Sequence, residues 1–392
     1  MSEQWTAWGP LAERYSTPGS RKILALDGGG IRGVITLGVL AALEEQLQKR
    51  QKNPDLRLCQ FFDLIGGTST GAIIAAALAR GMSVVEIADF YRRFGSVAFA
   101  RRRLWERWRS LYVDGGLVET LKETFGADTT LHPQDLRCLL TVVTRNATTD
   151  SAWPISSNPA AKYNDLKRAD CNLNIPLWQL VRASTAAPVF FPPEVVSWDR
   201  NDPAKSFVFV DGGTTAYNMN AFLLFRMATE PAYELGWETG EKNLLVVSVG
   251  TGSAPVLGDT ADNPATNVVE AALNTLSSLL SQTAVDQDVS CRVIGRCTYG
   301  GIIDRELRDL IPIDPNVPDT KLPLDVDTGK AFLYVRYNAE LTEAGLKELG
   351  LGNLDPHKLQ QMDEVDNLPD LQRVGGALGE RVSLDHFGSF AA

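Results

Sequence analysis

Residues 61–78 read FFDLIGGTSTGAIIAAAL. The apolar run 61–65 predicts a buried strand, and the alanine-rich run 72–78 predicts a buried helix. Between them, Gly67–Gly71 fits the pattern G-x-S-x-G, in which the two glycines let the backbone close a tight strand-to-helix turn. Such a turn leaves the hydroxyl of Ser69 exposed at the end of the strand, where the amides of the helix start favour negative charge. The stretch therefore predicts a nucleophilic serine, and a glycine-rich connection with an idle serine is the alternative.

The order of strands and helices predicts the fold class. Apolar runs typical of buried strands alternate with helical patterns, and several of the runs end in glycine-rich turns. The predicted strands are 21–26, 61–65, 137–143, 207–210, 244–249 and 331–337. We expect an α/β fold with a mostly parallel central sheet flanked by helices in three layers, with its site at the carboxyl ends of the strands. The expected divisions are a surface extension (1–20), one domain (21–340) and a helical C-terminal segment (341–392) packed on it.

The composition is that of an ordinary globular protein. The chain has 392 residues, of which 44% are hydrophobic and 22% charged. A net charge of −10 argues against a partner that is a nucleic-acid polymer. The five scattered cysteines include no C-x-x-C pair, which favours a reducing compartment and predicts no metal site. No secretory signal and no apolar run of about 18 residues is visible, so we expect a cytoplasmic protein.

A second glycine-rich turn, Asp27–Gly33, follows the first predicted strand. Its glycines match G-x-G-x-x-G, the fingerprint of dinucleotide-binding folds, but the next strand ends in the serine turn and not in the acid that binds a ribose. Consecutive backbone amides in such a loop suit an oxyanion hole, which stabilises negative charge developing on a carbonyl oxygen. A phosphate cradle and a plain tight turn are the alternatives.

The serine needs a base, and the sequence offers few histidines. Of the three, His132 and His357 have the pattern of surface residues, whereas His386 completes the order Ser, Asp, His that is typical of α/β-hydrolases. Asp211 is the stronger candidate because it ends an apolar strand, and burial would raise its pKa towards the working range of a general base. Asp27 stands similarly before three glycines, but a turn residue explains it equally well.

Three motifs in this order resemble the patatin-like phospholipases: Asp27–Gly33, the serine turn, and Asp211-Gly212-Gly213. Residues 182–193 also look like the segment that precedes the aspartate in that family, and the resemblance runs from about residue 21 to residue 337. It implies a Ser–Asp dyad without histidine, in which Ser69 is the nucleophile and Asp211 the base. It also implies an oxyanion hole formed by the backbone of Gly28, Gly29 and Gly30.

The resemblance implies hydrolysis of the acyl esters of membrane phospholipids through an acyl-enzyme, with no cofactor. The tail around 368–375 looks like that of bacterial cytosolic patatin-like proteins, some of which resemble antiphage effector phospholipases switched on by a cyclic nucleotide. A cyclic-nucleotide activator and a homo-oligomer are therefore compatible with the sequence. Two other readings stay open: a carboxylesterase of the α/β-hydrolase type that uses His386, and a nucleotide-binding protein without turnover.

A basic and aromatic segment lies at 92–112. It contains seven arginines against one acid, with interleaved aromatic side chains, in an otherwise acidic chain. This composition suits contact with anionic lipid headgroups during catalysis at a membrane surface, and a solvated helix is the alternative. The residues predicted to contact phosphate or membrane are Arg32, Arg101, Arg102, Arg103, Trp105 and Trp108.

Overall fold

A single mixed sheet forms the centre of the computed structural model, which describes residues 6–98, 115–188, 190–199, 202–253, 268–303 and 327–391. Its strands are β1 (Arg21–Leu26), β2 (Leu64–Thr68), β3 (Leu139–Asn146), β4 (Ser151–Ser156), β5 (Glu194–Ser197), β6 (Ser206–Asp211), β7 (Leu244–Val249), β8 (Arg296–Tyr299) and β9 (Leu333–Tyr337). They are paired in the order β5-β6-β3-β2-β1-β7-β9-β8, with β4 also paired to β3. The block from β3 to β8 is parallel, whereas β4, β5 and β6 pair antiparallel.

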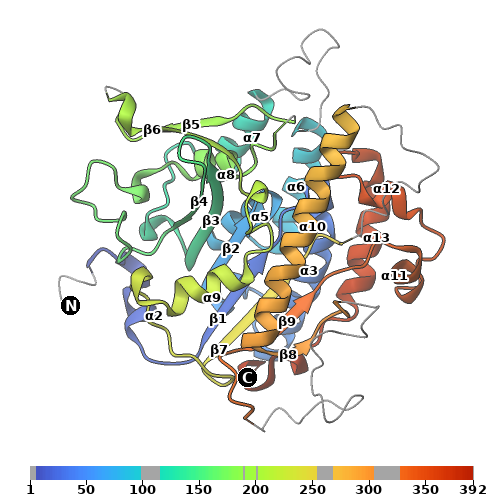
Figure 1. Cartoon of the computed structure of the whole chain (residues 1–392). Helices are drawn as coiled ribbons and strands as arrows, with labels where there is room; N and C mark the ends of the chain where they lie inside the picture. Colours follow the sequence, from blue (N-terminus) through green and yellow to red (C-terminus); the bar gives the residue numbers. More distant parts are fainter. Residues whose placement is uncertain are drawn as a thin grey trace.

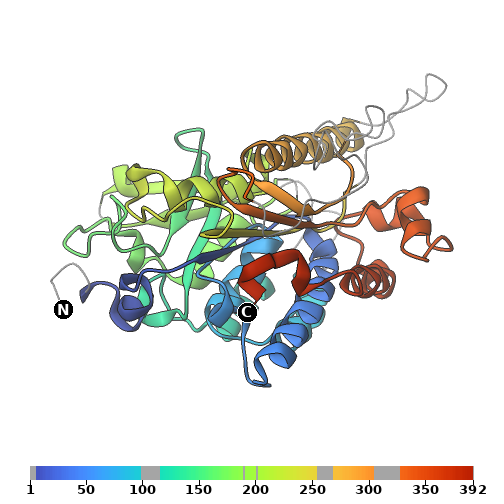
Figure 2. The same cartoon turned by 90° about the horizontal axis from the view of Figure 1, so that it is seen from below.

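Helices cover both faces of the sheet, and Figure 2 shows the three layers from the side. Alternate residues of β1 supply the two cores: Leu24 and Leu26 pack on one face, and Ile23 and Ala25 on the other. The first face carries α3 (Gly33–Gln51), α5 (Thr70–Ala79), α6 (Val84–Ala98), α7 (Gly115–Phe125) and α8 (Leu177–Ser184). The second carries α9 (Ala221–Thr229) and α10 (Val268–Ile294) (Figure 1). The predicted α/β class with a mostly parallel, three-layer sheet is confirmed.

The C-terminal segment is helical and belongs to the first face. It contains α11 (Glu343–Glu348), α12 (Pro356–Gln360), α13 (Leu368–Gly379) and a final 3-10 segment (Leu384–Ala391). Helix α13 packs along α3, and the buried Phe387 ring lies 6.2 Å from that of Phe61. Within the described residues, no helix combines the length and the apolar character that crossing a bilayer requires.

The N-terminal segment differs from the expected surface extension. A 3-10 turn (Gly9–Leu11) and α2 (Ala12–Ser16) bury the side chains of Trp8, Leu11 and Tyr15 in the second core. The prediction of a surface position is wrong for these residues, because the apolar side chains are separated by polar ones at helical spacing and the segment reads as polar overall.

The serine strand begins later than the apolar run predicts. Residues 58–61 form a short helix, α4 (Leu58–Phe61), and β2 starts only at Leu64. The Phe62 amide still donates to the carbonyl of Leu58, and the Asp63 carboxylate accepts from Arg14 and from the Lys22 amide. The expected strand over 61–65 is therefore wrong at its first residues, since an apolar run of this length does not distinguish a buried helical turn from a strand.

Strands β2 and β6 share one edge of β3. A strand has two hydrogen-bonding edges, and β4 occupies one of them opposite Thr141–Asn146. The other edge pairs with β2 over residues 139–143 and with β6 over residues 144–146. The carboxyl end of β2 therefore meets the carboxyl end of β6 head to head, although the two strands run in opposite directions.

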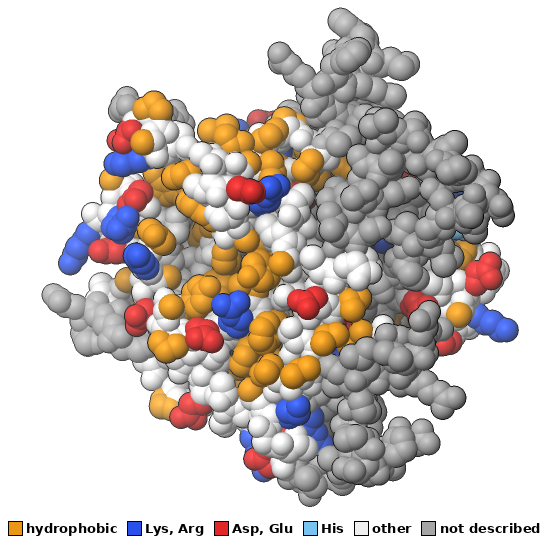
Figure 3. Space-filling model, viewed as in Figure 1, with side chains coloured by type: hydrophobic (Ala, Val, Ile, Leu, Met, Phe, Trp, Pro, Cys, Tyr) orange, Lys and Arg blue, Asp and Glu red, His pale blue; other side chains and the backbone are white. Residues whose placement is uncertain are grey.

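The outer face drawn in Figure 3 carries acidic and basic side chains among one another, with hydrophobic side chains between them. On this view, the described residues form no basic face of the kind on which a nucleic-acid polymer would bind.

Candidate active site

Ser69 sits at a strained turn between β2 and α5. Its backbone has φ 53° and ψ −120°, a conformation that residues other than glycine seldom adopt and that costs on the order of 1–3 kcal/mol. The flanking glycines are required by close backbone approach: a Cβ on Gly67 would lie 2.1 Å from the Gly71 carbonyl oxygen, and one on Gly71 would lie 2.4 Å from that of Leu26. The turn has the geometry that presents a serine hydroxyl at the end of a strand.

The Ser69 hydroxyl donates to the carboxylate of Asp211. The distance from Ser69 Oγ to Asp211 Oδ2 is 2.6 Å, and the Gly213 amide donates to Oδ1 at 2.7 Å. Asp211 is only 5% exposed, and this burial raises its pKa to about 6. The two hydrogen bonds and the positive charge of Arg182 oppose the rise but do not cancel it. The group is thus ionised at neutral pH and still basic enough to accept a proton.

The shared edge of β3 explains how Asp211 reaches the serine. We expect from the sequence that both strand ends emerge on one side of a parallel sheet, but β6 is antiparallel to β3. The carboxylate arrives because β6 runs towards the end of β2 and stops there. Hydrogen bonds from both backbone amides fix the two residues: the Asp211 amide donates to the Ala186 carbonyl at 3.0 Å, and the Ser69 amide donates to the side-chain oxygen of Ser184 at 2.9 Å.

The glycine-rich loop after β1 is anchored through its carbonyl groups. The Gly28 oxygen accepts from Thr251 Oγ1 at 2.8 Å, and the Gly29 oxygen accepts from the Arg32 amide at 3.3 Å. In a trans peptide the N–H and the C=O point in opposite directions. The amides of Gly29 and Gly30 are therefore directed away from these anchors, and both residues line the pocket beside Ser69.

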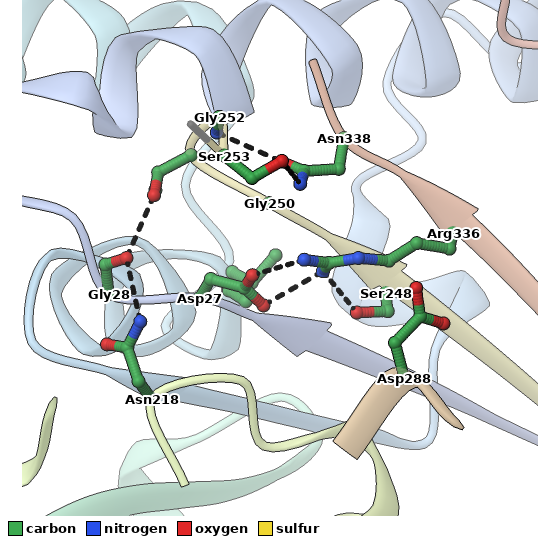
Figure 4. A network of polar contacts seen from close by, with 12 residues as sticks. Asp27, Gly28, Asn218, Ser248, Gly250, Gly252, Ser253, Asp288, Arg336 and Asn338 are labelled. Atoms are coloured by element: carbon green, nitrogen blue, oxygen red, sulfur yellow. Dashed lines mark hydrogen bonds and ion pairs between the residues drawn. The ribbon is translucent and has the colours of Figure 1, made fainter. Parts of the chain in front are cut away.

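The Gly28 amide has a different role from the one that the resemblance implies. It donates to the backbone carbonyl of Asn218 at 3.2 Å. In return, the side-chain amide of Asn218 donates to the Gly28 carbonyl oxygen at 3.4 Å (Figure 4). A group that already donates to a protein carbonyl is not available to an oxyanion. This geometry leaves the amides of Gly29 and Gly30 as the candidate oxyanion donors of the loop.

Asp27, the other aspartate before glycines, is paired with an arginine. Arg336, on β9, contacts both carboxylate oxygens at 3.0 and 2.6 Å and donates to Ser248 at 2.7 Å (Figure 4). Both charged side chains are buried. Burial raises the pKa of Asp27, and the Arg336 charge opposes that rise. Asp27 therefore ties the start of the loop to β9, which lies beyond β7 in the same sheet, and its carboxylate is engaged by Arg336 and not by the serine.

Ser69 and Asp211 open into a largely apolar pocket with about 790 Å³ of empty space, part of it open to solvent. Polar groups of the two loops form one side of the pocket. Its remaining wall is formed mainly by the side chains of Ile73, Tyr91, Leu117, Ala187, Pro188, Phe190, Phe191 and Met362. Such a wall suits a hydrocarbon chain with its polar end at the serine.

The other candidate residues lie apart from this pair. The His386 ring stacks on Tyr299 at 4.3 Å and its Nδ1 lies 2.7 Å from the Tyr337 hydroxyl, so it serves the packing of the last segment and not the serine. The Arg32 side chain turns back to the Gly29 carbonyl, with Nε at 3.5 Å, and its contact with phosphate stays a prediction. The predicted contacts Arg101, Arg102, Arg103, Trp105 and Trp108 lie outside the described residues. Among those described, no cluster of His, Cys, Asp or Glu could hold a metal ion.

The residues that sequence reasoning missed are those that anchor the loops: Tyr91, Asn218, Thr251, Arg336 and Met362. Except for Asn218, each stands alone in its own stretch of sequence, outside any recognisable pattern. Their contribution arises only when separate elements meet. Asn218 alone had a detectable signal, because it lies seven residues after Asp211 and close to the third motif.

Comparison with known proteins identifies relatives for the site-bearing part. Patatin group J-1 from Solanum tuberosum is 31% identical over 245 residues, which cover 59% of this chain and 60% of that protein. Patatin-17 from Solanum cardiophyllum is 30% identical over 247 residues with the same coverage. The chain thus spans about 60% of the length of these curated relatives.

Two solved structures show only distant likeness. VipD from Legionella pneumophila has a TM-score of 0.35 and 15% identity, covering 91% of this chain and 67% of that one. The type III effector ExoU has a TM-score of 0.25 and 13% identity, with coverages of 70% and 53%. Neither likeness bears on function.

The family model described as patatin-like phospholipase matches residues 24–225, more than half of the chain. The match includes the glycine-rich loop, the serine turn and the aspartate that bonds to the serine. On this match the chain belongs to the patatin-like phospholipase family.

Proposed function

We propose that the chain is a lipid acyl hydrolase of the phospholipase A type, with Ser69 as nucleophile and Asp211 as general base. The observation that carries the proposal is the 2.6 Å hydrogen bond between their side chains at the wall of an apolar pocket. A serine hydroxyl needs a positioned base, and this carboxylate has the burial and the raised pKa that the task requires.

The reaction has two halves. Asp211 takes the hydroxyl proton as Ser69 Oγ attacks the ester carbonyl carbon, and the carbonyl oxygen becomes an oxyanion that accepts from the Gly29 and Gly30 amides. The intermediate collapses, the protonated Asp211 gives its proton to the leaving alcohol, and the acyl group stays on Ser69. Water then enters, and Asp211 takes its proton as the water oxygen attacks the acyl carbon. When the bond to Ser69 Oγ breaks, Asp211 returns this proton to the Ser69 oxygen and the fatty acid leaves.

The pocket supports a lipid as the acyl donor. Apolar side chains form most of its wall, so transfer of an acyl chain from water or from a bilayer into it is favourable. We propose phospholipids at a membrane surface as the substrate class. The cyclic-nucleotide gate, the role in antiphage defence, the homo-oligomer and the membrane contact of the 92–112 segment stay predictions from the sequence.

Labelling of the serine tests the nucleophile. The wild-type chain is expected to react with a fluorophosphonate probe and to hydrolyse p-nitrophenyl butyrate, whereas S69A should do neither. His386→Ala is the discriminating control, since an esterase that depends on His386 would lose its activity and a Ser–Asp enzyme would keep it. Labelling of S69A at the wild-type rate would refute the proposed nucleophile.

The substrate class needs its own experiment. Phospholipid vesicles incubated with the wild-type chain should release free fatty acid and lysophospholipid, measured by mass spectrometry, and S69A should release none. An active esterase that leaves every phospholipid intact would restrict the proposal to smaller esters.

A further inference from the structure

Tyr91 connects the two loops of the site. It lies on α6, its side chain is 1% exposed, and it belongs to the wall of the pocket. Its hydroxyl donates to the carbonyl oxygen of Gly30 at 2.5 Å and also contacts the hydroxyl of Thr70. Gly30 belongs to the glycine-rich loop after β1, and Thr70 directly follows the nucleophile after β2. A single side chain therefore contacts both halves of the site.

The proton inventory fixes the direction of this chain of hydrogen bonds. A phenol has one proton to donate, and the Gly30 carbonyl can only accept it. The Thr70 hydroxyl must then donate to the Tyr91 oxygen. Burial raises the pKa of the Tyr91 phenol, so the group keeps its proton throughout the working range. The order of donation is Thr70, Tyr91, Gly30.

The Gly30–Ile31 peptide of the glycine-rich loop is held at both its carbonyl and its amide. Tyr91 holds the carbonyl of the Gly30–Ile31 peptide, and the Ile31 amide donates to the carbonyl of Met362 at 2.8 Å. Gly30 has φ +59°, a conformation available without strain to glycine. The local 3-10 turn supplies one bond to its carbonyl, from the Gly33 amide, and the contacts from Tyr91 and Met362 add restraints from other elements.

The space around the hydroxyl groups of Thr70 and Tyr91 shows how closely the two loops approach each other. A Cβ on Gly33 would lie 2.6 Å from both the Thr70 hydroxyl oxygen and the Tyr91 hydroxyl oxygen. The two hydroxyl groups thus occupy the space directly beside the start of α3, and no side chain fits between them and the loop.

We propose that Tyr91 is a positioning residue for catalysis: it aligns the Gly29 and Gly30 amides with the Ser69 hydroxyl by tying the Gly30 carbonyl to Thr70. It does so without touching the reacting atoms. This inference rests on the proposed function, because it assigns a role within the same acyl transfer. Tyr91→Phe removes the tie and preserves the ring that packs in the core.

Kinetics of Tyr91→Phe provide the first test. Loss of alignment in the transition state is expected to lower kcat for p-nitrophenyl butyrate on the order of 10- to 100-fold, with KM within about twofold of wild type. Affinity for a trifluoromethyl ketone, which forms an oxyanion on the serine, should fall in parallel with kcat/KM. The midpoint of the pH profile should not move, since Tyr91 does not titrate in that range.

Tyr15→Phe is the matched control. The Tyr15 hydroxyl is also buried, donates to a backbone carbonyl (Asp63, 2.5 Å) and accepts one hydrogen bond (from the Leu139 amide, 2.9 Å), but it lies outside the pocket. Tyr91→Phe loses one contact more, with the Gly33 amide, so a purely structural role predicts a loss of melting temperature at least as large as that of Tyr15→Phe and an unchanged kcat in both variants. Thr70→Ser keeps the hydroxyl that donates to Tyr91 and should keep the wild-type kcat. Thr70→Val lacks it and should lower kcat as Tyr91→Phe does.

The outcomes separate the two proposals. An inactive S69A together with Tyr91→Phe at the wild-type kcat would overturn the positioning role and leave the serine mechanism intact. A lowered kcat with unchanged affinity for the trifluoromethyl ketone would also overturn it, because the oxyanion donors would then be aligned. A fully active S69A would remove the proposed function itself.

Discussion

At the scale of single residues, Asp211 links activity to stability through one physical cause. Burial raises its pKa to about 6, which makes it a usable base at neutral pH. The same burial makes the ionised carboxylate costly to hold in the folded chain. The first two predictions separate these consequences.

The pH dependence of activity should report the ionisation of Asp211. The base must be deprotonated, so kcat/KM of the wild-type chain is expected to fall below a midpoint near pH 6, tenfold for each further pH unit. A stopped or continuous assay with p-nitrophenyl butyrate from pH 4.5 to 9 measures it. A midpoint near 4 would mean that the carboxylate is not perturbed, and the proposed assignment of the base would fail.

Asp211→Asn should abolish turnover and stabilise the fold. A carboxyl whose folded pKa is raised binds its proton more tightly when folded, so the wild-type chain loses stability as the pH rises from about 4 to about 6. The shift of about 2 units corresponds to at most about 3 kcal/mol. The variant lacks this loss, and an asparagine can still accept from Gly213 and donate to Ser69. Urea denaturation at pH 8 should show the gain, and the gain should shrink towards pH 4.5; an equal difference at both pH values would contradict it.

Sequence reasoning identified the residues that we propose to carry chemistry and missed those that contact the loops around them. Ser69, Asp211 and the glycines stand in patterns whose spacing is set by a local turn, so the pattern is visible without the fold. Tyr91, Thr251 and Gly28 differ because their roles depend on contacts between elements distant in sequence. The Gly28 amide could not be distinguished from its neighbours until Asn218 was seen to occupy it.

At the scale of elements, the direction of β6 is the feature that local sequence does not encode. An apolar strand before Asp-Gly-Gly reads the same whether it runs parallel or antiparallel to β3. The prediction that Asp211 meets Ser69 agrees with the structure, but the parallel pairing offered as its reason is wrong. The actual reason is the edge of β3 that β2 and β6 share.

The packing of α13 on α3 gives a prediction for two glycines, one at the contact between the helices and one that faces away from it. A Cβ on Gly38 would lie 2.4 Å from the carbonyl carbon of Gly375, whereas one on Gly376 meets nothing within 4 Å. Gly38→Ala should therefore lower the free energy of unfolding by about 1–3 kcal/mol through overpacking. Gly376→Ala should raise it by up to about 1 kcal/mol, since alanine is the better helix former.

Chemical denaturation of both variants measures the difference. Equal effects of the two substitutions would show that the helices separate without cost, and that the C-terminal segment is not fixed to the rest of the chain by this contact.

At the scale of the whole molecule, residues beyond the family match complete the site. The match ends at residue 225, yet Thr251 anchors the Gly28 carbonyl, Arg336 pairs with Asp27, and Met362 accepts from Ile31. Strand β7 also lies beyond the match and covers one edge of β1. The glycine-rich loop is therefore held in part by residues beyond the match, and we expect the matched segment alone not to form a working site.

The Asp27–Arg336 pair tests this long-range coupling, because 309 positions separate its members and both are only 4% exposed. Arg336→Gln leaves a buried carboxylate without its cation, so at pH 8 we expect a loss of about 3–5 kcal/mol in the free energy of unfolding. The loss should diminish at acid pH, since the pKa of Asp27, already raised by burial, rises further without the arginine, and protonation then removes the charge.

Asp27→Asn combined with Arg336→Gln should cost less than the sum of the single changes, because an amide pair leaves no charge behind. Lys49→Ala removes an exposed i,i+4 pair with Glu45 and serves as the control, expected to cost under about 0.5 kcal/mol. Strict additivity in the double variant would mean that the two strands are held by packing alone and that this ion pair does not hold the glycine-rich loop in place.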